Sequence, residues 1–289
     1  MFGARRLAGI RWGMRSSATR ALTDYLNAQI DEIENGDEEL RHGGGEDPVH
    51  DTRVAIRRLR STLRVFAKLL DRQRVGDADG ELKWFAALVG DVRDCEVQER
   101  RFAKALDRIP DELILGPVRS RIRNDLRAIE LPARARLDEA MDSDRYRALL
   151  TVLRDWRYEP PVAQQISAAA LRKRARRAER KADRRLAEAL GSDDNELLHR
   201  ARKAAKRARY AAELRNPLDK RAKRTVKHYK RIQSLLGDHQ DTVVATQRLR
   251  QMALAAGTAL GENGFSYGML YAREQQLAGQ CREDALQLV

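Results

Sequence analysis

The chain has 289 residues, of which 42% are hydrophobic and 35% are charged, and its net charge is +14. This hydrophobic share excludes a disordered polycation, and no run of about 18 apolar residues is present to span a membrane as a helix. The many charged residues and only 7 prolines favour an all-α protein with long solvated helix faces.

Helical periodicity runs through the first half of the chain. Apolar residues recur every three or four positions from Leu22 to Ile33, and Gly36 is predicted to end that helix. Pro48 stands where the first turn of the next helix tolerates proline. The helices predicted here cover residues 17–35, 48–71, 77–108 on either side of Gly90, 117–130 and 134–154.

A domain boundary is predicted at Trp156–Pro161, because two consecutive prolines cannot continue a helix. It separates a first helical repeat at residues 17–158 from a second at residues 162–289, and a basic leader at residues 1–16 precedes both. The helices predicted in the second half cover residues 163–190, 199–215, 218–236, 238–256 and 265–286. No convincing strand pattern occurs, which again predicts an all-α fold.

One predicted helix carries a row of positive side chains along one edge. A helical wheel places these residues within a sector of roughly 80°, separate from the apolar sector that contains Ile56 and Leu59. The row contains no carboxylate and extends about 21 Å. Its members are His50, Arg53, Arg57, Arg60 and Arg64. Arginine forks suit the oxygen atoms of phosphate, so a linear polyanion could bridge the whole row.

The same row occurs again in the second half. His199, Arg202, Lys206 and Arg209 repeat the first four offsets, and Glu213 replaces the fifth base. A second pair of matching segments follows the two rows, Leu88–Asp94 and Leu235–Asp241. The histidines lie 149 residues apart and the glycines of the two segments 147 residues apart. Two matched landmarks at nearly one offset indicate an internal duplication.

The excess positive charge is concentrated. Residues 167–231 contain 23 Lys and Arg but only 8 Asp and Glu, so the remainder of the chain is nearly neutral. This concentration favours a polyanionic partner, and the Arg-rich helix at 172–185 could either extend the binding surface or form a separate outer patch. Cys95 and Cys281 show neither pairing nor metal-binding spacing, which favours a reducing, cytoplasmic setting.

Four motifs in order resemble those of the CHAD (conserved histidine α-helical) domain family. They are His50-x-x-Arg53-x-x-x-Arg57-Arg58-x-Arg60, Leu88-x-Gly90-x-x-Arg93-Asp94, His199-x-x-Arg202-x-x-x-Lys206-Arg207-x-Arg209-Tyr210 and Gln233-x-x-Leu236-Gly237-x-x-Gln240-Asp241. The resemblance implies two pseudo-symmetric four-helix bundles and a basic groove that binds inorganic polyphosphate. It also implies frequent fusion to a triphosphatase-type module, for which we expect no room in this chain.

The resemblance assigns the groove to the two rows and their neighbours. The implied lining residues are His50, Arg53, Arg57, Arg60, His199, Arg202, Lys206 and Arg209, flanked by Arg58, Lys203 and Arg207. Arg64, Lys227 and Lys230 are candidates by spacing and charge alone. We expect the histidines to donate to phosphate rather than to bind a metal, since their cationic neighbours would repel a cation. No catalytic residue, cofactor or metal site is expected, and protein partners are not specified.

Two other functions remain open at the sequence level. A nucleic-acid-binding protein would account for the charge, although 5% aromatic residues offer no stacking platform and no recognition-helix motif occurs. A phosphohydrolase would require clustered carboxylates around a metal ion, and neither such a cluster nor a glycine-rich phosphate loop is visible. Scattered aspartates could still converge in three dimensions. The expectation is a polyphosphate-binding protein in the cytoplasm, with polyphosphate granules as a possible location.

Overall fold

A computed structural model describes residues 16–163, 165–259 and 262–288, so nearly all of the predicted basic leader lies outside the described residues. The helices are α1 (Ser17–His42), α2 (Pro48–Val65), α3 (Arg72–Val75), α4 (Ala78–Leu106), α5 (Val118–Asp142), α6 (Asp144–Tyr158), α7 (Ala168–Leu190), α8 (Asn195–Arg215), α9 (Ala222–Ala256) and α10 (Phe265–Leu286). The predicted all-α class is confirmed. In the described residues, the extended pairing is a single isolated bridge between Leu70 and Val162.

Side-chain caps explain why several helices begin where they do. Ser16, Asp47, Ser143 and Ser167 stand immediately before α1, α2, α6 and α7, and each side-chain oxygen accepts a hydrogen bond from a backbone N–H of the first turn. Such caps satisfy donors that the helix itself leaves unpaired. No described helix combines the length and the apolar composition that crossing a bilayer requires.

The predicted end of the first helix at Gly36 is wrong. Helix α1 continues through Gly36 to His42, and Gly36 is buried against Thr52 of α2. A Cβ atom at residue 36 would overlap the Thr52 hydroxyl. The glycine therefore permits a close approach of two helices rather than ending one of them.

Other helix boundaries also differ from the predictions. Helix α5 passes through Pro132 to Asp142, where a break was predicted near residues 131–133. The turn around Pro132 faces solvent, so water can hydrogen-bond the carbonyl that proline leaves unpaired. Helix α9 runs unbroken through Gly237, although two helices were predicted there. In addition, α2 ends at Val65 rather than near residue 71, and α7 begins at Ala168 rather than near residue 163.

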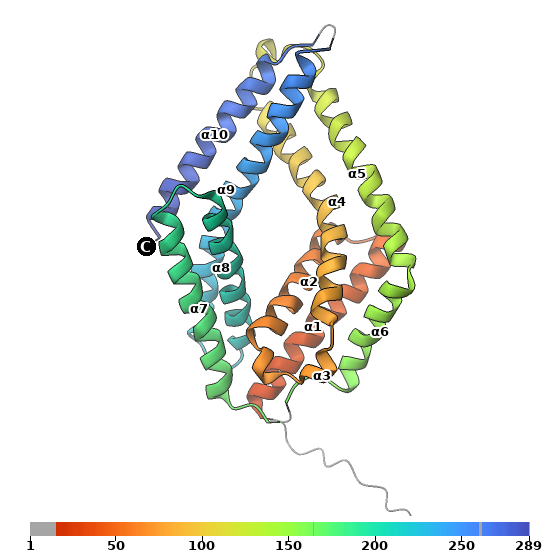
Figure 1. Ribbon diagram of the computed structural model, residues 1–289, viewed down its shortest axis with the longest axis vertical. Coiled ribbons are helices and arrows are strands. Elements are labelled where there is room, and N and C mark those ends of the chain that lie inside the picture. The colour runs from red at the N-terminus through yellow and green to blue at the C-terminus, as the bar shows by residue number, and fades with distance from the viewer. Residues whose placement is uncertain (1–15, 164, 260–261, 289) are drawn as a thin grey trace, which may run out of the picture.

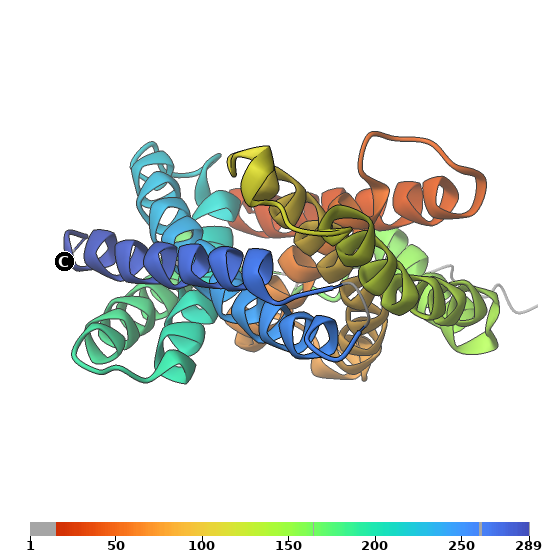
Figure 2. The same ribbon diagram turned by 90° about the horizontal axis from the view of Figure 1, so that it is seen from above.

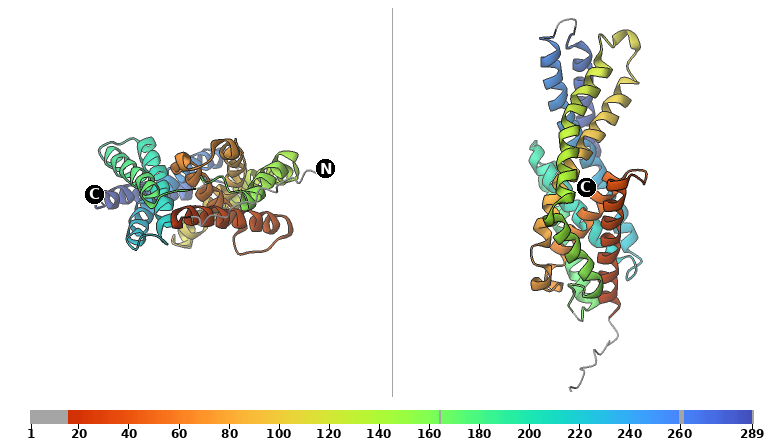
Figure 3. Two further views of the ribbon diagram at one scale, coloured as in Figure 1. Left: turned by 90° about the horizontal axis from the view of Figure 1, so that it is seen from below. Right: turned by 90° about the vertical axis from the view of Figure 1, so that its right-hand side faces the viewer.

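The helices form an elongated frame with two long hairpins. The α4–α5 and α9–α10 hairpins converge at one end, and α1, α2, α6, α7 and α8 surround the other (Figure 1). Figure 2 shows the converging hairpins from above, and Figure 3 shows the frame from below and from its right-hand side. Helices α2 and α8, which carry the two predicted rows, are in contact with each other.

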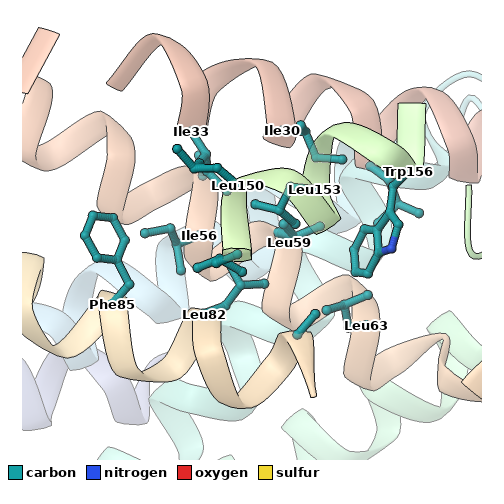
Figure 4. Packing of buried hydrophobic residues seen from close by; sticks show 14 of the residues in the cluster. Ile30, Ile33, Ile56, Leu59, Leu63, Leu82, Phe85, Leu150, Leu153 and Trp156 are labelled. Atoms are coloured by element: carbon teal, nitrogen blue, oxygen red, sulfur yellow. The ribbon is translucent and has the colours of Figure 1, made fainter. Parts of the chain in front are cut away.

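The largest core cluster lies among α1, α2, α4 and α6. Side chains from all four helices interdigitate in Figure 4, including Ile30, Leu59, Phe85 and Trp156. Leu171 and other residues of α7 and α8 belong to this same cluster, and a separate cluster joins the tips of both long hairpins. The hydrophobic core therefore crosses the predicted repeat boundary, and this holds α2 and α8 in fixed relative positions.

Candidate functional site

A cavity of about 610 Å³ lies where α2 and α8 face each other, with α4 and α9 completing its wall. Nine Arg or Lys side chains line it, against two Asp. The lining residues are His50, Arg53, Arg57, Arg60, Ser61, Arg64, Arg93, Asp94, Val97, Gln98, His199, Arg202, Lys203, Lys206, Arg207, Tyr210, Gln233, Gln240, Asp241 and Val244. All five residues of the α2 row and three of the four residues of the α8 row therefore line one shared space.

Packing explains how α8 presents its row. Ala201, Ala204, Ala205 and Ala208 are fully buried on the opposite face, in a cluster formed with α7, α9 and α10. Small side chains allow close helix packing. This thin alanine face seats α8 deeply and leaves its cationic edge toward the cavity.

Four predicted site residues lie outside the cavity lining. Arg58 and Arg209 both donate hydrogen bonds to the Glu213 carboxylate, at 3.2 and 2.8 Å, and Arg209 also donates to Gln233 of the cavity wall at 3.2 Å. Lys227 and Lys230 are exposed on the first turns of α9, where they do not line the cavity. The contact of Arg58 with Glu213 on another helix leaves no signal in residue spacing, whereas Arg209 and Glu213 lie four residues apart on α8.

Arg57 and Lys206 lie at equivalent positions of the two rows and share the cavity. Burial, together with the positive charges of the nearby Arg202, Arg57 and Arg53, lowers the pKa of Lys206 to about 6. Burial likewise lowers the pKa of Arg57. The Nε atoms of Arg57 and Arg202 are buried and have no hydrogen-bond partner among the described residues. Such donors are costly to leave unpaired, so they would favour an anionic acceptor.

A repeated arrangement of Arg, Gly and Asp positions one arginine of each row. Arg53 lies over Gly90 and donates a hydrogen bond of 2.7 Å to Asp94. In the second half, Arg202 lies over Gly237 in the same way. A Cβ on either glycine would be about 3.6 Å from the guanidinium group, an ordinary contact. The two glycines thus provide a flat helix surface on which each arginine rests.

The far end of the α2 row is partly neutralised. Arg60 and Arg64 both donate to the carboxylate of Asp79 on α4, at 3.1 and 2.7 Å. Two guanidinium groups share one carboxylate, so a net positive charge remains. Asp79 lies outside the rows in sequence, and only the fold brings it to them.

The two histidines lie at the starts of their rows. Burial lowers the pKa of His50 and His199, and the neighbouring Arg93 and Lys203 add to the effect. Both imidazoles are therefore mostly neutral near pH 7. Arg93 also donates to Asp47 at 2.8 Å, and Asp47 caps α2, so α4 helps fix the start of that helix.

Several lining residues were not proposed as site residues from the sequence. Arg93, Asp94, Gln233, Gln240 and Asp241 occur in the quoted motifs, and this recurrence is the signal that could have identified them. Ser61, Val97, Gln98 and Val244 carry no comparable signal. Within the part of the chain that the structure describes, no three His, Cys, Asp or Glu residues gather as a metal site would require.

The chain is similar in sequence to a known domain family and to two larger proteins. The CHAD domain matches residues 24–250. Two curated Mycobacterium tuberculosis proteins, Uncharacterized protein Rv2226 and Uncharacterized protein MT2285, are each 35% identical over 243 residues, covering 82% of this chain and 46% of the relative. The chain thus spans less than half the length of these relatives.

Two solved structures are similar to this one. PptA from Streptomyces chartreusis has a TM-score of 0.77 at 22% identity, covering 93% of this chain and 98% of its own. The CHAD domain from the plant Ricinus communis has a TM-score of 0.68 at 24% identity, covering 94% and 88%. These likenesses concern the fold. Because the family match spans most of its residues, this chain belongs to the CHAD domain family.

Proposed function

We propose that this protein binds linear inorganic polyphosphate in the cavity between α2 and α8. The observation that carries the proposal is the convergence of two cationic rows, from distant parts of the chain, on one cavity. Family membership supports the same ligand class, since polyphosphate binding is what the CHAD resemblance implies. Polyphosphate carries negative charge on every unit, which matches a lining of nine Arg or Lys and two Asp.

The chemistry of the lining favours binding over cleavage. Its carboxylates stand beside arginines: Asp94 pairs with Arg53, and the charge of Arg202 acts on Asp241. We therefore propose that these aspartates orient guanidinium groups and that the protein has no catalytic role. Incubation with long polyphosphate should release no phosphate and no shorter chains.

Binding of long polyphosphate would also direct the protein to polyphosphate granules in the cytoplasm. RNA or DNA binding is the competing proposal. Nucleotides carry bulky bases and sugars, whereas a polyphosphate chain is narrow enough to follow a cavity between helices. Tyr210 is the one Phe, Tyr or Trp side chain among the described lining residues, which offers little stacking surface for bases.

A double charge reversal tests the proposal. Arg57→Glu with Lys206→Glu places two carboxylates at the centre of the cavity, and affinity for long polyphosphate should fall by a factor of about 100 or more. The matched control is Lys227→Glu with Lys230→Glu, which makes the same substitution of two basic residues by glutamate on the exposed surface of α9. Equal affinities of the cavity variant and the control, with helicity intact by circular dichroism, would remove the cavity from the account.

A further inference from the structure

A second pocket of about 290 Å³ adjoins the central cavity. It lies among the end of α2, the 3-10 turn Ala67–Leu69, and the facing sides of α7 and α8. Arg64 and Arg207 line both spaces. The two pockets are therefore neighbours that share these two side chains.

Every charged residue that lines this second pocket is basic. The six are Arg64, Lys68, Arg174, Arg177, Lys181 and Arg207. Arg64 is paired with Asp79, whereas the other five form no ion pair with a described residue. Several other surface arginines are held by carboxylates, as Arg134 is by Glu96 and Arg157 by Asp31. The second pocket is thus a concentration of unneutralised cations.

The spacing of three basic residues along α7 places them on the side of the helix that lines the second pocket. Arg174, Arg177 and Lys181 lie three and four residues apart, so they share one face of the helix around Ala178. The positive charge of Arg185 lowers the pKa of Lys181, and burial and the charge of Arg207 lower it further. Like charges at this spacing destabilise a helix. The arrangement costs stability, so it is not explained by folding.

We propose that a long polyphosphate chain leaves the central cavity between Arg64 and Arg207 and continues along α7, making the second pocket a subsite for long chains. This rests on the proposed function of the central cavity. Short chains fill the cavity alone, and only chains long enough to pass Arg64 and Arg207 gain the contacts with Arg174, Arg177 and Lys181. The Arg-rich helix would then set the preference for chain length.

The test compares two triple variants on the full chain. The pocket variant reverses the charge of the α7 residues that line the second pocket: Arg174→Glu, Arg177→Glu and Lys181→Glu. The control variant reverses the charge of exposed α7 residues that line neither pocket: Arg172→Glu, Lys173→Glu and Arg184→Glu. Both carry the same change in charge. Affinities are measured for a short and a long polyphosphate at one salt concentration, with circular dichroism as the folding check.

The proposal predicts that the pocket variant loses affinity for the long chain by about tenfold or more beyond the control, while its affinity for the short chain matches the control. Equal losses of the two variants for the long chain would overturn it. So would loss of RNA binding with long-polyphosphate binding intact. Failure of the central proposal looks different, because the unaltered protein would then bind neither the short nor the long chain.

Discussion

The contacts and the pKa values of individual cavity side chains depend on their surroundings in the fold, which residue spacing in the sequence does not show. The spacing of His50, Arg53 and Arg57 correctly indicates which residues share a helix edge. It cannot show that Glu213 of α8 accepts a hydrogen bond from Arg58 of α2, because that contact depends on how α8 meets α2. Nor does spacing show that burial and neighbouring arginines leave Lys206 with a pKa of about 6.

The pKa of Lys206 makes a prediction at this scale. The unliganded protein holds Lys206 mostly neutral at pH 7.5, and a bound polyanion stabilises the ammonium form, which raises its pKa. Binding then takes up a proton and weakens as pH rises from about 6 toward 8, by at most about tenfold per pH unit for one proton. Below pH 6, where Lys206 is already charged, its contribution levels off, while His50 and His199 continue to gain protons.

Calorimetry in two buffers with different ionisation enthalpies measures this uptake directly. We expect Lys206→Gln to bind with clearly less proton uptake at pH 7.5 than the unaltered protein, because the amide does not titrate. If both proteins take up the same number of protons on binding, Lys206 is not the titrating group.

Helix boundaries were predictable where glycine interrupts the helical pattern just before a helix, as Gly264 does. The last helix, at residues 265–286, has the predicted bounds. Predictions failed at Gly36, Pro132 and Gly237, where residues with low helical propensity stand inside continuous helices. Tertiary packing outweighs propensity at Gly36, which lies against Thr52, and solvent exposure relieves the cost at Pro132.

Replacing the glycines of these helices by alanine should change the free energy of unfolding in opposite directions at different positions. At Gly90 and Gly237 an added Cβ meets only an arginine side chain at ordinary distance, so each Gly→Ala should raise the free energy of unfolding by about 0.5–1 kcal/mol. At Gly36 the Cβ would overlap Thr52, and Gly36→Ala should lower it by about 1–3 kcal/mol. Urea denaturation of the three variants checks the signs, and stabilisation by Gly36→Ala would refute the close approach of α1 and α2.

The folded molecule brings together the cationic rows of α2 and α8, which lie in different halves of the chain. The duplicated rows predict two similar helices, but no pattern within either half indicates that they face each other. That arrangement follows from core residues shared across the repeat boundary and from packing between the tips of the two long hairpins. The ion pair of the partly exposed Arg101 with the buried Glu274, at 2.6 Å, joins α4 to α10 in the same region. The central cavity therefore exists only in the intact chain.

The most direct test at this scale is a binding titration of the pure, full chain against long polyphosphate, short polyphosphate and RNA at matched salt. We predict that long polyphosphate binds most tightly and displaces RNA at far lower concentrations of phosphate units, with an affinity that falls steeply as salt increases. RNA binding that equals or exceeds polyphosphate binding under these conditions would contradict the account.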